Sequence, residues 1–188
     1  MCISYIVAPI SRTGSQHRLQ GSAATPLRET AHVGRPYPEA TDDERELLLS
    51  WLRFEREAVL SKLAGLDERQ ARLRPMERGN SILGLVKHLT VAERRWIDGA
   101  FLGGPVPLLT PAEFEPEAHL EIDHFIDEYL IACARTDEVV HESTLGTEAS
   151  RGPGRTLLWV LLHLIEETAR HAGHADITRQ WVDGTVGI

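Results

Sequence analysis

The chain has 188 residues, enough for one domain with a hydrophobic core, and 42% hydrophobic with 26% charged residues is ordinary for a globular protein. Its formal net charge of −8 argues against a nucleic-acid backbone or an anionic membrane as partner, because nothing would replace the phosphate counterions. Small molecules and proteins remain as candidate partners.

The cysteines and the apolar segments indicate a cytoplasmic protein. Cys2 and Cys133 are far apart, and Cys133 lies in an apolar stretch, so the sequence suggests neither a disulfide framework nor a thiolate zinc site. The opening segment 3–10 is apolar but short, contains Pro9 and lacks a basic region before it. We therefore expect no signal peptide and no transmembrane helix.

Residues 1–40 are rich in Ser, Gly, Pro and Arg and show no periodicity. Such a segment cannot bury enough apolar surface to offset the entropy of ordering it. We predict a disordered N-terminal extension over residues 1–40 and a helical domain over residues 41–184. Whether the extension belongs to the native protein is open from the sequence.

The first two predicted helices follow from capping and breaking signals. Thr41 with Glu44 three residues later forms a capping box, which predicts a helix from 41 to about 64. Asn80 or Ser81 caps the second helix, which continues until the Gly and Pro residues at 103–105.

The remaining pattern predicts two more helices, over 117–141 and 155–183, the last one stopping at Gly184. No segment alternates with the period of two that a half-buried strand requires, so the fold class is all-α, a four-helix bundle. The connection between helices two and three spans about fourteen residues at about 3.3 Å each, which would allow a crossover.

Four potential metal ligands share one face of the last helix. His163, Glu167, His171 and His174 fall within an arc of about 80° at 100° per residue. That face also carries apolar residues, and a carboxylate pointing inward must be neutralised, paired or bound to a cation. Glu167 and His171, one turn apart, make a suitable chelate.

A third ligand should come from another helix, and His88 lies on the inner face of the second helix between Leu85 and Ala92. Two imidazoles and one carboxylate would leave open positions on a divalent ion. The sequence does not identify the metal, since two imidazoles and a carboxylate suit zinc, nickel, iron or manganese; zinc is our first expectation.

Simpler interpretations of these residues stay open. His88 could be an ordinary core histidine, and Glu167 and His171 could form only a hydrogen-bonded pair. His163 and His174 fit better behind the ligands, where they could orient Glu167 or transfer a proton.

Segments 83–96 and 156–176, which contain these residues, resemble an actinobacterial branch of the DinB/YfiT-like superfamily, a branch of unknown function. The similarity runs from about residue 41 to 184. It implies a four-helix bundle with a metal site that is commonly built from three histidines, and the matching positions here are His88, Glu167 and His171. The glutamate departs from that pattern but resembles the mycothiol-dependent maleylpyruvate isomerases, whose zinc site has two histidines and a glutamate.

The resemblance implies a metal-dependent S-transferase or isomerase that combines a low-molecular-weight thiol, such as mycothiol, with a small-molecule electrophile. Two alternatives are a metal-assisted hydrolase and a non-catalytic, stress-related metal-binding bundle. Apolar residues near Leu108 and Leu109 could belong to a homodimer interface.

Overall fold

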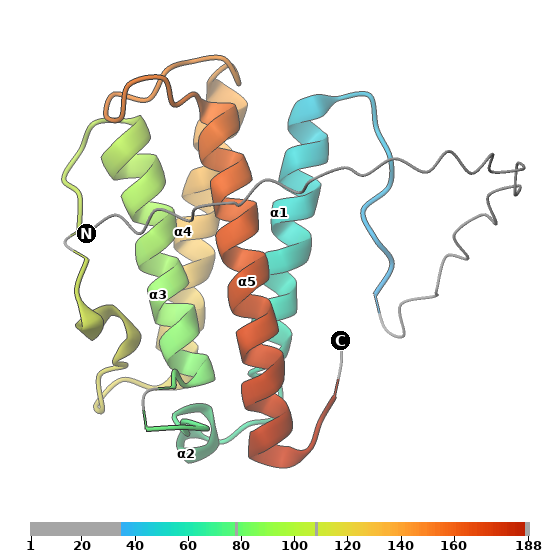
Figure 1. Ribbon diagram of the computed structural model, residues 1–188, viewed down its shortest axis with the longest axis vertical. Coiled ribbons are helices and arrows are strands. Elements are labelled where there is room, and N and C mark those ends of the chain that lie inside the picture. Colours follow the sequence, from blue (N-terminus) through green and yellow to red (C-terminus); the bar gives the residue numbers. More distant parts are fainter. Residues whose placement is uncertain (1–34, 78, 108, 187–188) are drawn as a thin grey trace, which may run out of the picture. The chain divides into compact units, whose positions relative to one another are not determined.

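The computed structural model describes residues 35–77, 79–107 and 109–186. Its long helices within these ranges are α1 (Glu44–Ser61), α3 (Ile82–Arg94), α4 (Ile122–Glu142) and α5 (Leu157–Asp183), and they pack as a bundle (Figure 1). In the described ranges, β pairing is limited to one isolated bridge between Glu148 and Thr156. The predicted all-α four-helix bundle is confirmed.

Side-chain caps set where the helices begin. The Asp43 carboxylate accepts hydrogen bonds from the backbone of Arg45 and Glu46, so α1 begins after Asp43 and not at Thr41 as predicted. The hydroxyl of Thr41 instead accepts from the backbone N–H of Asp43, 3.1 Å away. Ser81 caps α3, in agreement with one of the two predicted caps.

The C-terminal helix has the predicted end, and the third helix starts later than predicted. Gly184 follows α5 with a φ of +81°, a left-handed conformation that glycine adopts at little cost. The helix predicted from residue 117 begins at Ile122.

Two short elements of the described ranges lie outside the predicted helices: α2 (Glu68–Ala71) and the 3₁₀ turn η2 (Pro111–Phe114). The second predicted helix is present but changes type, because α3 continues as the π-helical segment η1 (Arg95–Phe101).

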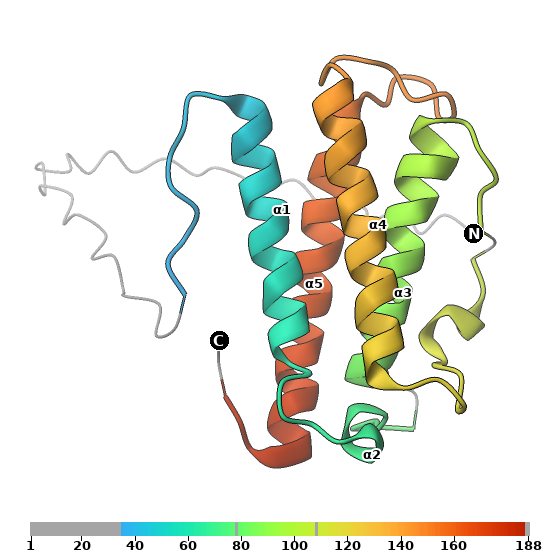
Figure 2. The same ribbon diagram turned by 180° about the vertical axis from the view of Figure 1, so that it is seen from behind.

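The chain crosses over between α3 and α4. Figures 1 and 2 show these two helices running in the same direction, and the connection after Phe101 returns alongside α3 before α4 begins. The predicted crossover is therefore confirmed. It places η2 against the side of α3, where the two elements are in contact.

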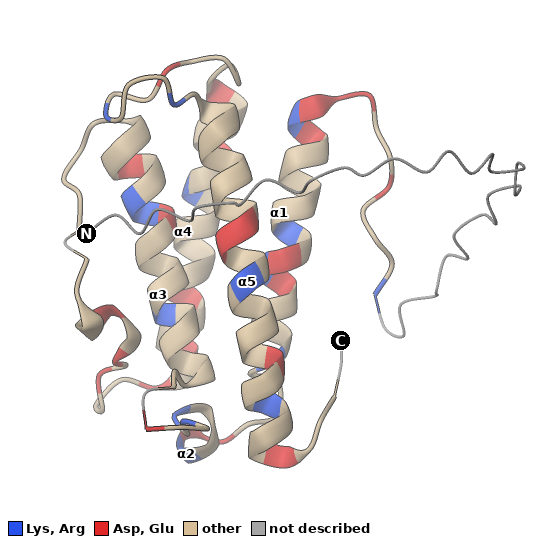
Figure 3. Ribbon diagram, viewed as in Figure 1, with Lys and Arg blue, Asp and Glu red and all other residues tan. Residues whose placement is uncertain are grey.

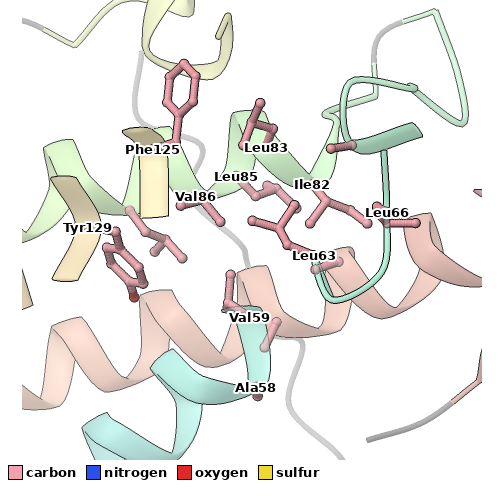
Figure 4. Packing of buried hydrophobic residues seen from close by; sticks show 14 of the residues in the cluster. Ala58, Val59, Leu63, Leu66, Ile82, Leu83, Leu85, Val86, Phe125 and Tyr129 are labelled. Carbon is pink, nitrogen blue, oxygen red and sulfur yellow. The ribbon is translucent and has the colours of Figure 1, made fainter. Parts of the chain in front are cut away.

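Two clusters of buried apolar side chains hold the bundle together. One, shown in Figure 4, joins Val59 of α1, Leu83 of α3 and Tyr129 of α4. The other includes Leu49 of α1 and Leu161 of α5, both fully buried. Burial of a large aliphatic side chain stabilises a fold by roughly 1.5–3 kcal/mol, so these clusters are the main source of stability.

Charged side chains occupy both the interior and the surface. Arg56 of α1 and Glu93 of α3 are buried and form an ion pair at 2.8 Å, and Arg56 also contacts Asp137 of α4. In the view of Figure 3, acidic and basic positions are interspersed along the helices. No helix in the described part of the chain is long and apolar enough to cross a membrane.

Most of the predicted extension, residues 1–34, lies outside the described residues. The described residues at the end of this predicted extension, from Arg35 onward, contact α1. Arg35 donates a hydrogen bond to the carbonyl of Phe54 at 2.8 Å, and the ring of Tyr37 lies 5.7 Å from those of Phe54 and Trp51.

Candidate metal centre

The structure brings the three predicted ligands together between α3 and α5. His88 projects from α3, and Glu167 and His171 come from successive turns of α5. Oε1 of Glu167 lies 3.0 Å from Nε2 of His88 and 3.3 Å from Nε2 of His171. One potential ligand atom from each residue lies within 4.8 Å of the other two.

Burial and charge favour an ionised carboxylate in this cluster. Hydrogen bonds from His171 and His88 hold the pKa of Glu167 well below its usual range, and Arg170 adds an ion pair at 2.8 Å. His88 and His171 are buried, whereas the Glu167 side chain keeps 15% exposure. The site therefore places one negatively charged carboxylate and two imidazole rings close together near solvent.

The donor set fits a divalent ion. Imidazole nitrogen and carboxylate oxygen bind Zn²⁺ at about 2.0–2.2 Å, so two donors of a tetrahedral ion are roughly 3.3 Å apart. The separations of 3.0 and 3.3 Å are close to that value. They are also hydrogen-bond distances. The same geometry therefore fits the simpler interpretation that Glu167 and His171 form a hydrogen-bonded pair.

His174 and His163 lie next to the cluster in different surroundings. Nδ1 of His174 is 3.3 Å from Nδ1 of His171, on the side of that ring opposite the contact with Glu167. The ring of His163 stacks against Trp159 and meets Trp96 edge-on, at centroid distances of 5.4 and 4.3 Å. His174 is thus placed to orient His171, whereas His163 is part of an aromatic cluster.

Two neighbours of His88 were missed by the sequence reasoning. The Phe114 ring stacks on the His88 ring at 4.1 Å, and a Glu113 carboxylate oxygen lies 3.6 Å from His88 Nδ1. Both residues belong to η2, which shows no helical periodicity. The sequence carries no signal that this turn lies over α3.

A cavity of about 240 Å³ adjoins His174. The loop before α3 and the last turns of α5 form it, and most of its surface is apolar. Its lining residues are Pro75, Met76, Gly79, Asn80, His174, Ile177 and Thr178. A larger cavity of about 560 Å³, near the start of α4, shares none of these residues and none of the candidate ligands.

Comparison with known proteins supports the fold and identifies the family. A crystal structure of a conserved protein from Enterococcus faecalis covers 76% of this chain and 98% of its own, with a TM-score of 0.57 and 18% sequence identity, which supports the fold. Comparison with curated proteins gave no match. Residues 47–184, which contain all three candidate ligands, match the mycothiol-S-transferase family. The chain therefore belongs to the mycothiol-S-transferase family.

Proposed function

We propose that this protein is a metal-dependent S-transferase, or an isomerase of the same chemistry, that uses a low-molecular-weight thiol such as mycothiol. The observation that carries the proposal is the convergence of His88, Glu167 and His171 in a chain of this family. A divalent ion held there would supply Lewis acidity, which lowers the pKa of a bound thiol and favours the nucleophilic thiolate at neutral pH. Zinc is the proposed ion, with nickel, iron and manganese as alternatives, because two imidazoles and a carboxylate suit all four metals.

The protein's own buried thiol is unsuited to the nucleophilic role. Cys133 is 8% exposed, and burial raises its pKa well above the usual value for a thiol. A thiol that remains protonated is a poor nucleophile. The proposed reaction accordingly takes its sulfur from a small-molecule thiol.

The side chains around the centre have separate roles in the proposal. Glu167 stays ionised and balances positive charge, as its lowered pKa supports. If His171 binds metal through Nε2, its Nδ1 carries hydrogen and donates to His174 Nδ1, 3.3 Å away. His174 is exposed and can exchange protons with solvent through its other nitrogen.

The cavity beside His174 is the proposed place for the apolar part of the electrophile. Exposed apolar side chains at its rim are Met76, 70% exposed, and Ile177, 65% exposed. Ligand pockets are typically apolar with a few polar groups, and here His174, Asn80 and Thr178 supply the polar groups.

The first test is elemental analysis of protein purified without chelator or affinity metal. We expect close to one metal per chain in wild type and loss of the metal in His88→Ala, Glu167→Ala and His171→Ala. His124→Ala is the matched control, because His124 is exposed at the start of α4. Full occupancy in the His171→Ala variant would reject the site.

Reaction rates then separate the functional candidates. A transferase consumes an electrophile faster when a low-molecular-weight thiol is added, whereas a metal-assisted hydrolase does not need the thiol. A metal-loaded protein without either activity would support the non-catalytic binding bundle.

A further inference from the structure

We propose that Glu113, held by Arg95, is a positioning residue for His88: it accepts a hydrogen bond from His88 Nδ1 and thereby presents Nε2 to the metal. This inference rests on the proposed metal centre. It assigns a role to the crossover connection, which contributes none of the three candidate ligands.

Two buried polar atoms face each other across this contact without any other partner. Nδ1 of His88 and Oε1 of Glu113 are both buried, and neither has a hydrogen-bond partner among the described residues. They are 3.6 Å apart, a few tenths of an ångström beyond a normal hydrogen bond. Buried polar groups are seldom left unpaired, so the pair indicates a bond that a small shift would complete.

Arg95 fixes the orientation of the Glu113 carboxylate. Nη2 of Arg95 donates to Oε2 of Glu113 at 2.6 Å, and both residues are buried, with 9% and 5% exposure. This bond uses the second carboxylate oxygen and balances its charge. Oε1 is therefore left to face His88.

The tautomer of His88 connects this contact to the metal. Without an ion, Nε2 can carry the hydrogen and donate it to Glu167 Oε1, 3.0 Å away, and Nδ1 then has nothing to donate to Glu113. A nitrogen that binds metal carries no hydrogen, so the hydrogen must move to Nδ1 when Nε2 becomes a ligand. The Glu113 carboxylate is the acceptor that the metal-binding tautomer needs, as is common behind histidine ligands.

The turn that carries Glu113 is fixed to α3 by several contacts. Lys87 Nζ donates to the carbonyls of Ala112 and Glu115 at 3.0 and 2.7 Å. The next residue after Glu113, Phe114, stacks on the His88 ring with an interplanar angle of 14°. Glu113 and Phe114 therefore both reach the His88 ring from one anchored turn.

The test compares zinc dissociation constants, measured by competition with a chelating indicator, for wild type, Glu113→Ala and Glu113→Gln. We expect Glu113→Ala to bind zinc about 10- to 100-fold more weakly while still binding one ion, the range typical for partners of ligand histidines. Glu113→Gln should lose less zinc affinity, because its amide oxygen can accept a hydrogen bond from Nδ1 of His88. It also keeps the side-chain volume, so it can replace Glu113→Ala in the test if the alanine variant does not fold.

Glu93→Gln is the matched control, because Glu93 is also a buried acid of this bundle that pairs with an arginine, Arg56. It should lower the melting temperature and leave zinc affinity unchanged. If Glu113 only anchors its turn, Glu113→Ala should behave in the same way, with a lower melting temperature and wild-type zinc affinity.

Imidazole ¹⁵N NMR of the zinc-loaded protein gives a direct readout of the tautomer. We expect His88 to be protonated at Nδ1 with a protected, downfield proton that Glu113→Ala loses. Wild-type zinc affinity in Glu113→Ala, or complete loss of metal as expected for His88→Ala, would overturn the positioning role. Failure of wild type itself to bind metal would instead reject the proposed function.

Discussion

The Glu167 carboxylate lies in an environment unlike that of a surface acid. It accepts hydrogen bonds from His171 and His88 through one oxygen and pairs with Arg170 through the other. These interactions favour the ionised form over the cost of partial burial, and its pKa is lowered. Its charge is therefore available over the whole range of physiological pH.

This lowered pKa predicts how the metal-free protein responds to acid. A group with a lower pKa in the folded state stabilises the fold above its unfolded pKa, and this contribution is lost as pH falls from about 4.5 toward the folded pKa. We expect the free energy of unfolding of chelator-treated wild type to fall more steeply below that pH than that of Glu167→Gln. Urea unfolding at a series of pH values measures both slopes.

Glu166→Gln is the control for this experiment. Glu166 also pairs with Arg170, but its side chain is 60% exposed, so solvent screens the interaction. It should change the acid slope less than Glu167→Gln does. Identical slopes for wild type and Glu167→Gln would contradict the hydrogen-bonded carboxylate described here.

The three candidate ligands could be predicted from the sequence, but the contact between Glu113 and His88 could not. Glu167 and His171 are one helical turn apart, and His88 shares a face with apolar residues of its helix, so both features can be seen in the sequence. Glu113 is brought to His88 by the tertiary path of a connection, and local periodicity contains no information about that path. The aromatic surroundings of His163 likewise depend on how α5 packs on α3 and η1.

At the scale of elements, the close packing of η2 against α3 depends on a glycine. A Cβ added at Gly84 would lie 2.4 Å from the carbonyl oxygen of Phe114, closer than real contacts allow. The obstacle is backbone, so the turn itself would have to move. The crossover and the missing side chain at residue 84 together place Phe114 and Glu113 beside His88 of the candidate metal centre.

We therefore expect Gly84→Ala to displace η2 and weaken zinc binding, even though alanine favours a helix over glycine by roughly 1 kcal/mol. Zinc competition and thermal unfolding measure the two effects. Gly173→Ala on α5 is the control: nothing lies within 4 Å of its added Cβ, so it should raise stability and keep zinc affinity. Unchanged zinc affinity in Gly84→Ala would contradict the expectation that the position of η2 affects zinc binding.

Helix positions were predictable from periodicity to within a few residues, but their ends depended on contacts. The predicted start of α4 at residue 117 was wrong because the preceding segment is fixed elsewhere: Lys87 pairs with Glu117 at 2.8 Å. The carboxylate of Glu68 accepts from the backbone of Ile122, where the helix starts, at 2.6 Å. Such partners lie far away in the sequence, so no capping pattern includes them.

At the scale of the whole bundle, the candidate metal centre lies in a fold that has other sources of stability. The two apolar clusters extend over all four long helices, whereas the candidate ligands come from α3 and α5 alone. These two helices also pack directly on each other. A metal ion would thus add to an existing contact and would not create it. A homodimer interface near Leu108 and Leu109, which the sequence left possible, stays a prediction: Leu109 is 78% exposed, and Leu108 lies outside the described residues.

Metal removal should accordingly lower thermal stability without unfolding the bundle. An ion that binds only the folded state stabilises it by about 2.7 kcal/mol at a free concentration 100 times the dissociation constant. For a domain of this size, that corresponds to a rise in melting temperature of roughly 5 to 10 °C. We expect a chelator to abolish this rise in melting temperature and to leave the helical circular dichroism at room temperature unchanged. Added zinc should restore the higher melting temperature. His171→Ala should respond to neither chelator nor zinc. Loss of helical signal on chelation would make the ion a structural requirement of the fold, and an unchanged melting temperature in metal-loaded wild type would contradict binding to the folded state.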